Sequence, residues 1–109
     1  MVKVKIKKKN NRIHYFEIKG HANASEYGED IVCSAISVLG QTCIIGLMEV
    51  AFISVKHRIE PGHLTCEIPN DLTAAKAREA DIIVNTMYLG MKSVQHSYSE
   101  FMEINVLEV

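Results

Sequence analysis

The stretch DIVCSAISVLGQTCIIGLMEV, residues 30–50, is the longest apolar run of this 109-residue chain. Between Ile31 and Val55 only Glu49 is charged. Asp30 precedes the run, and aspartate is a favourable N-cap, so the sequence predicts a long helix that begins at Ile31. A helix that is apolar on nearly all sides must be buried on nearly all sides.

Protein rather than lipid is expected to bury this helix. The run exceeds the ~20 residues that span a bilayer, but it lacks basic flanks and aromatic belts. Polar residues also interrupt it, namely Ser34, Ser37, Gln41, Thr42 and Ser54. One sheet and one further helix of a small monomer cannot cover every side, so we expect a homodimer and no membrane contact. Gly40 and Gly46 are expected to let another backbone approach closely at that interface.

Alternating apolar residues on both sides of this helix predict strands. The expected strands cover residues 2–7, 13–19, 55–59, 64–68 and 101–107. Turns at Asn10–Asn11 and Pro61–Gly62 join the first two strands, and then the next two, into hairpins.

A second helix is expected after the break at Pro69, with Thr73 as its N-cap. Its expected buried stripe is Ala80, Ile83, Val84, Met87, Met91 and Val94. The element order is therefore ββαββαβ. This order predicts an α+β fold, a two-layer sandwich of a mostly antiparallel sheet with two helices on one face. The length suits a single domain over residues 1–109.

The charge of the chain is unevenly spread, although the net charge is only −1. Six of the twelve basic residues and none of the thirteen acidic ones lie in the first twelve positions. Lysines on a sheet edge protect it from aggregation, which is the simpler interpretation. A basic hairpin also attracts RNA. One candidate function is therefore a non-enzymatic ribosome- or RNA-binding module, as an alternative to the enzyme considered below. An enzyme that also contacts the ribosome or rRNA would have both properties.

The three cysteines Cys33, Cys43 and Cys66 form no CxxC pair and no even framework. An odd number of cysteines without a secretory signal indicates a reducing compartment, so we expect a cytoplasmic protein. Helical spacing keeps Cys43 away from Cys33, and Cys66 has the pattern of a core strand residue. The sequence predicts no disulfide, no metal site and no cofactor.

Cys33 is the candidate nucleophile. If Asp30 caps the helix, Cys33 occupies its third position, where the helix dipole favours a thiolate. Ser37 lies one turn further on the same face, and the amides near Cys33 and Ser34 are candidate oxyanion donors. A cysteine in an apolar helix also packs as a small hydrophobic residue, which is the alternative interpretation.

His21 is the candidate base. It follows Gly20 and precedes Ala22, in a polar loop bounded by Gly20 and Gly28 that suits movement over a site. It lies twelve positions before Cys33, far enough for the chain to fold back into contact. Asp30 has two possible roles, as a helix cap or as the group that orients His21. An exposed loop histidine is the alternative interpretation.

Two sequence words resemble those of the bacterial ribosomal-processing cysteine proteases, the Prp family. They are Gly20-His21-Ala22 and Gly28-Glu29-Asp30-Ile31-Val32-Cys33-Ser34-Ala35-Ile36-Ser37. Weaker similarity covers nearly the whole chain, including Gly62-His63-Leu64. The two words at this spacing, between a hairpin and an apolar helix, are specific.

The resemblance implies a small homodimeric α/β cysteine endopeptidase with a Cys-His dyad. Members of the Prp family remove a short N-terminal extension from a large-subunit ribosomal protein. The resemblance therefore implies that the extended form of this ribosomal protein is the substrate. It assigns Cys33 as nucleophile and His21 as base, and it gives Asp30 and Ser37 supporting roles. It also implies a mobile loop over the site at residues 20–28.

Overall fold

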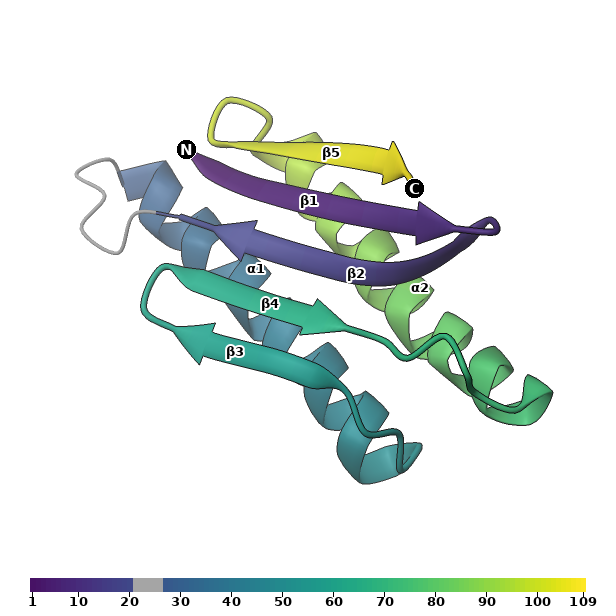
Figure 1. Ribbon diagram of the computed structural model, residues 1–109. Helices are drawn as coiled ribbons and strands as arrows, with labels where there is room; N and C mark the ends of the chain where they lie inside the picture. Colours follow the sequence, from purple (N-terminus) through teal and green to yellow (C-terminus); the bar gives the residue numbers. More distant parts are fainter. Residues whose placement is uncertain (21–26) are drawn as a thin grey trace.

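Five strands and two helices follow one another in the order ββαββαβ in the computed structural model, which describes residues 1–20 and 27–109 (Figure 1). The strands are β1 (Val2–Lys9), β2 (Arg12–Lys19), β3 (Lys56–Glu60), β4 (His63–Glu67) and β5 (Met102–Glu108). The helices are α1 (Tyr27–Ile45), which a π-helical turn η1 (Gly46–Val50) extends, and α2 (Ala74–Ser97). The predicted order and α+β class are confirmed.

The sheet has the strand order β3-β4-β2-β1-β5. All its pairs are antiparallel except β1 with β5, so the sheet is mixed but mostly antiparallel, as predicted. Strand alternation works as expected in β1, where Val2, Val4 and Ile6 are buried while Lys3 and Lys5 are exposed. The lysines therefore lie on the sheet face opposite the helices.

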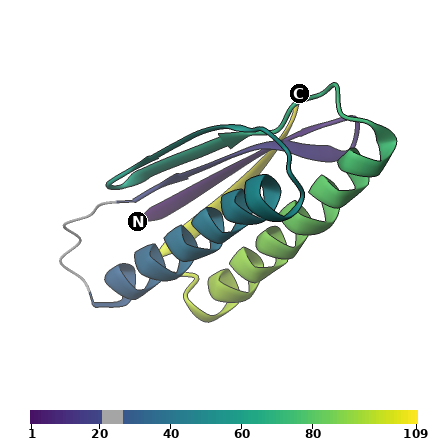
Figure 2. The same ribbon diagram turned by 90° about the horizontal axis from the view of Figure 1, so that it is seen from below.

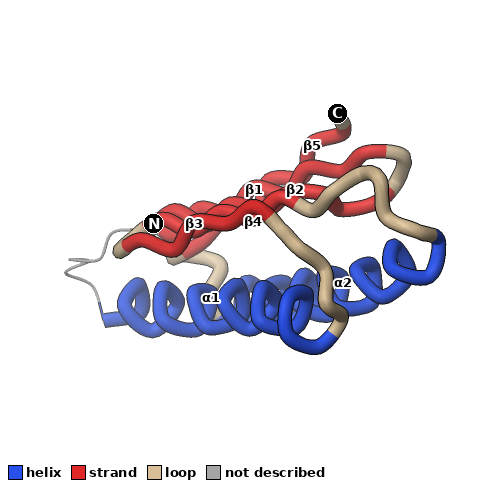
Figure 3. The backbone as a smooth tube through the Cα atoms, turned by 60° about the horizontal axis from the view of Figure 1, so that its bottom comes forward, coloured by secondary structure: helices blue, strands red, loops and turns tan. Residues whose placement is uncertain are grey.

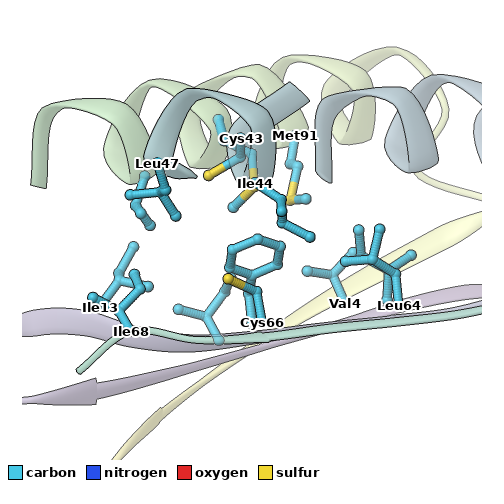
Figure 4. Close-up of a cluster of buried hydrophobic side chains, with 14 of the residues drawn as sticks. Val4, Ile13, Cys43, Ile44, Leu47, Leu64, Cys66, Ile68 and Met91 are labelled. Atoms are coloured by element: carbon cyan, nitrogen blue, oxygen red, sulfur yellow. The ribbon is translucent and has the colours of Figure 1, made fainter. Parts of the chain in front are cut away.

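Both helices pack on the same face of the sheet (Figures 2 and 3). The core fills the space between the two layers, and Figure 4 shows part of it. Its largest fully buried side chains are Phe16, Ile6, Ile36, Leu47 and Met91. Four of the six residues predicted for the buried stripe of α2 are buried, and Ile83 and Val94 are partly buried. The layered arrangement leaves the outer sheet face without a helix.

The start of α1 differs from the prediction. The helix begins at Tyr27, so Asp30 lies inside its first turn and is not the N-cap. Cys33 is consequently the seventh residue of α1 instead of the third. The predicted cap of α2 is confirmed, because the Thr73 hydroxyl accepts a hydrogen bond from the Lys76 amide at 3.2 Å.

The two glycines of the apolar run contact the rest of this chain, which accounts for them without a second subunit. A Cβ added to Gly40 would lie 2.6 Å from Ile18 Cδ1, on the sheet. A Cβ added to Gly46 would lie 3.2 Å from Ile83 Cγ2, on α2. The absence of side chains at these positions therefore lets α1 approach its own sheet and α2 closely.

The segment Asp30–Val50 is long and apolar enough to cross a membrane by length and composition alone, and 33% of its most apolar window is buried. Core helices of soluble proteins pass the same test, so this is weak evidence for a span. The inner side of α1 packs on the sheet. Val38 and Ile45, on other sides of the same helix, remain 61% and 56% exposed.

Candidate active site

The Cys33 thiol lies where α1, the end of β2 and the β3–β4 turn meet. A Cβ added to Gly20 would lie 3.3 Å from Cys33 Sγ, so the sulfur lies close to the last described residue before His21. The Gly20 amide donates a hydrogen bond of 3.0 Å to the Gly62 carbonyl, which ties the end of β2 to the turn. Cys33 is partly buried against the core. The sulfur therefore lies beside the point where the Gly20–Gly62 hydrogen bond joins the end of β2 to the β3–β4 turn.

A narrow hollow of about 30 Å³ opens beside this sulfur. Residues of α1 form one wall, and the β3–β4 hairpin forms the other. Its lining includes Gly20, Cys33, Ser37, Gln41, Ile59 and His63. The structure thus places Ser37 beside Cys33 in the lining of one hollow. Gln41, Ile59 and His63 were not predicted, although spacing by four residues along the helix from Cys33 and Ser37 would have found Gln41.

The other predicted site residues are placed differently. Ser34 is exposed and lines a groove between α1 and α2, so its side chain does not face the hollow. His21 and Ala22 lie outside the described residues. Gly28 belongs to α1, so the segment between β2 and α1 is shorter than the predicted loop 20–28. Asp30 is exposed in the first turn of α1.

The position of Cys33 in the helix changes its expected electrostatics. Only the first four amides of a helix lack an intrahelical acceptor, and the dipole effect falls off within the first turn. The amides of Cys33 and Ser34 are the seventh and eighth of α1. Inside a helix these amides bond to carbonyls of the preceding turn, so this position does not favour them as oxyanion donors, and their role stays a prediction.

Cys43 and Cys66 are structural thiols. Both are buried, and they point into the core from α1 and β4 respectively (Figure 4). Burial raises the pKa of each thiol to about 12. Thiols with such a pKa hold almost no thiolate at neutral pH, so they do not act as nucleophiles.

Selective alkylation is expected to separate the three thiols. Iodoacetamide at pH 8 should modify the native protein once, at Cys33, because the other two thiols are buried and protonated. In denaturant all three should react. Mass spectrometry of tryptic peptides measures the sites, and modification of Cys43 in the native protein at the rate of Cys33 would contradict the assignment.

On the outer face of the sheet, the His63 side chain lies within hydrogen-bond distance of Glu17. This pair is not predicted from the sequence. The Nε2 atom of His63 lies 2.6 Å from Oε2 of Glu17, so the two side chains join β4 to β2 next to Gly62 and Gly20. Burial raises the pKa of Glu17, but the His63 hydrogen bond with the nearby charges of Lys19 and Lys5 outweighs it. The pKa is lowered overall from 4.5.

A Glu17→Gln variant is expected to be less stable than the wild type at pH 7, by about 1 kcal/mol, because it loses a charge-assisted hydrogen bond. The folded pKa of Glu17 lies below its ordinary value of 4.5. Its contribution is therefore complete above that value and is lost as the pH falls through the folded pKa. Urea unfolding at pH 7, 5 and 3.5 should show the two proteins converging in acid.

The matched control is Glu103→Gln, on the same sheet face in β5. It should change the free energy of unfolding little at any of these pH values. A difference between Glu17→Gln and the wild type that stays constant with pH would show that packing, not ionisation, is lost.

Comparisons with known proteins agree with this architecture. A family model described as "Cysteine protease Prp" matches residues 1–103. The ribosomal processing cysteine protease Prp of Bacillus subtilis is 22% identical over 107 residues, which cover 95% of this chain and 96% of that protein. Its counterpart in Staphylococcus aureus strain Mu50 is 29% identical over 92 residues, 79% of each chain.

Solved structures with the same fold include SMU.848 from Streptococcus mutans. It has a TM-score of 0.86 and 22% identity, and the match covers 100% of this chain and 96% of that one. Prp from S. aureus in complex with a substrate peptide has a TM-score of 0.85 and 21% identity, with 97% and 99% covered. The family match covers residues 1–103 and therefore includes β2, α1, β3 and β4, the elements that surround Cys33. The chain therefore belongs to the cysteine protease Prp family.

Proposed function

We propose that this protein removes the short N-terminal extension of a large-subunit ribosomal protein during ribosome assembly, as a cytoplasmic enzyme of one domain. The observation that carries the proposal is the half-buried Cys33 sulfur, held against Gly20 at the mouth of a hollow. The related proteins of B. subtilis and S. aureus are named ribosomal processing cysteine proteases. Prp of S. aureus is also known in complex with a covalently linked product peptide, which supports a thiol nucleophile.

The proposed reaction uses Cys33 as nucleophile and His21 as base. His21 takes the thiol proton, and the sulfur attacks the carbonyl carbon of the scissile bond. The protonated His21 then gives its proton to the leaving amine, and water hydrolyses the acyl-enzyme. The nearness of Gly20 to the sulfur supports this pairing, because His21 is the next residue in the chain.

Asp30 and Ser37 are proposed as supporting residues. Because α1 begins at Tyr27, Asp30 is not required as its N-cap, which leaves the carboxylate available to orient His21. Ser37 lines the hollow one helical turn from Cys33, where its hydroxyl can contact the substrate.

Incubation with the extended ribosomal protein tests the proposal. Mass spectrometry should detect a product shortened at its N-terminus, and an unchanged protein after prolonged incubation with the native enzyme would overturn it.

A homodimer is proposed as the active assembly. The outer side of the two helices exposes aliphatic residues, among them Val38 and Leu89, which are 61% and 65% exposed. A shallow and mostly apolar groove lies between α1 and α2. A second copy would bury this surface, and an exposed apolar patch of this kind is typical of an interface. A Val38→Asp/Leu89→Asp variant should sediment as a monomer if this face mediates dimerisation.

Contact with rRNA is proposed for the outer face of the sheet. Lys3, Lys5 and Lys7 alternate with the buried residues of β1, and Lys19 is the cross-strand neighbour of Lys3. In the described part of the chain both helices lie on the opposite face of the sheet (Figure 3). Replacing Lys3, Lys5 and Lys7 with glutamine should make the slope of log K against log salt concentration shallower by roughly 0.7 to 0.9 per lost phosphate contact with RNA. Unchanged salt dependence would exclude this face.

A further inference from the structure

Along α1, the hollow beside Cys33 is lined by a row of polar side chains, which we call the track. Cys33, Ser37 and Gln41 line it and follow one another at intervals of four residues, which places them on one face of the helix. Eight residues of helix rise about 12 Å. The nucleophile therefore lies at one end of a track about as long as four residues of extended peptide, at about 3.3 Å each.

The edge strand β3 forms the opposite wall of this track. Ile59 pairs with Leu64 in the neighbouring strand β4, and side chains of paired residues point to the same sheet face. Leu64 is buried beneath the helices, whereas Ile59 is 49% exposed although it lines the same hollow. Ile59 therefore borders the track as a half-exposed apolar residue.

Both walls carry groups that remain without a partner in the described part of the chain. The side-chain amide of Gln41 is exposed and forms no hydrogen bond with any described residue. β3 pairs only with β4 among the described strands, so its outer edge has unpaired backbone groups. An extended peptide satisfies both, because its main chain offers donors and acceptors at regular intervals.

We propose that Gln41 and Ile59 form the subsite that binds the substrate on one side of the scissile bond. This inference rests on the proposed function, because it takes the bond to be cleaved at Cys33. The substrate lies extended between α1 and β3, and the Gln41 amide hydrogen-bonds to its main chain. Ile59 packs against an apolar side chain of the substrate. The hollow itself holds only about 30 Å³, so the peptide lies across its open side.

Peptide binding to an inactive background tests the subsite directly. The probe is a fluorescein-labelled peptide that spans the cleavage site of the extended ribosomal protein, and anisotropy is measured with Cys33→Ala protein. Adding Ile59→Ala should weaken binding about tenfold, because a half-exposed isoleucine loses most of its apolar contact. Adding Gln41→Ala should weaken it about fivefold, the effect of one neutral hydrogen bond.

Two control variants match these changes in chemistry and exposure. Thr42→Ala alters the next exposed polar residue of α1, which does not line the hollow. Val106→Ala shortens an aliphatic residue of the other edge strand β5, which is 41% exposed. Both controls should bind the peptide as the Cys33→Ala parent does.

The outcomes separate the subsite from the proposed function. Binding equal to the controls in both Gln41→Ala and Ile59→Ala would overturn the subsite, even if the wild type cleaves the substrate. Binding that weakens as expected, with no cleavage by the wild type, would support the subsite and overturn the proposed function. No binding to the Cys33→Ala parent and no cleavage would overturn both.

Discussion

A Cys33→Ala variant is expected to lose at least about 10⁴-fold in kcat/KM for the extended ribosomal protein, because removing the nucleophile leaves only substrate binding. The change removes one sulfur from a partly buried position at the rim of the core, so the fold should survive. Cleavage is measured by quantitative mass spectrometry, and the retained fold by circular dichroism and thermal unfolding.

Cys43→Ala is the matched control for this loss. It removes a thiol from the same helix, but from a position that is buried in the core and does not line the hollow. We expect it to lower stability by about 1 kcal/mol and to retain nearly full activity. If Cys33→Ala cleaves the substrate as well as Cys43→Ala does, the nucleophile has been assigned incorrectly.

A His21→Ala variant is expected to lose about 10²- to 10⁴-fold in kcat, the usual contribution of a general base. The effect should be large here because Cys33 is the seventh residue of α1, beyond the turn where the helix dipole favours a thiolate. The loss should shrink as the pH rises, since a growing fraction of the thiol then ionises without the help of His21. Rates measured between pH 6 and 9 test this.

His96→Ala provides the control, because His96 is exposed in the last turn of α2. It should behave as the wild type in cleavage and in the rate of Cys33 alkylation. His21→Ala should slow alkylation at pH 7, which a merely structural role of His21 would not do. Equal alkylation rates in the two variants would exclude His21 as the base.

Much of the fold was predictable because its signals are local. Val2, Val4 and Ile6 alternate with lysines, and this alone indicates a strand with one buried face. The cap at Thr73 was predictable for the same reason, since it depends on the residues of one helical turn. Asp30 misled because an acid stabilises a helix both as N-cap and within the first turn, and the sequence does not separate the two.

The surroundings of Cys33 depended on contacts between distant parts of the chain. His63 and Glu17 lie 46 positions apart, and only the pairing of β2 with β4 brings them within 2.6 Å. In the sequence, Ile59 has only the pattern of an ordinary strand residue. The strand order shows that its strand β3 lies at the sheet edge, where Ile59 lines a hollow with residues of α1. Strand periodicity specifies which face a residue takes but not which strand becomes its neighbour.

The sequence was therefore sufficient for the element order, the layer arrangement, the core position of Cys66 and the choice of Cys33 as candidate nucleophile. Each of these follows from periodicity, residue type or a motif within a few turns of chain. The helical position of Cys33, the role of Gly20 as its contact and the track formed with Gln41 and Ile59 came only with the assembled structure. They depend on the packing of α1 against one end of the sheet, and packing is a property of the whole chain.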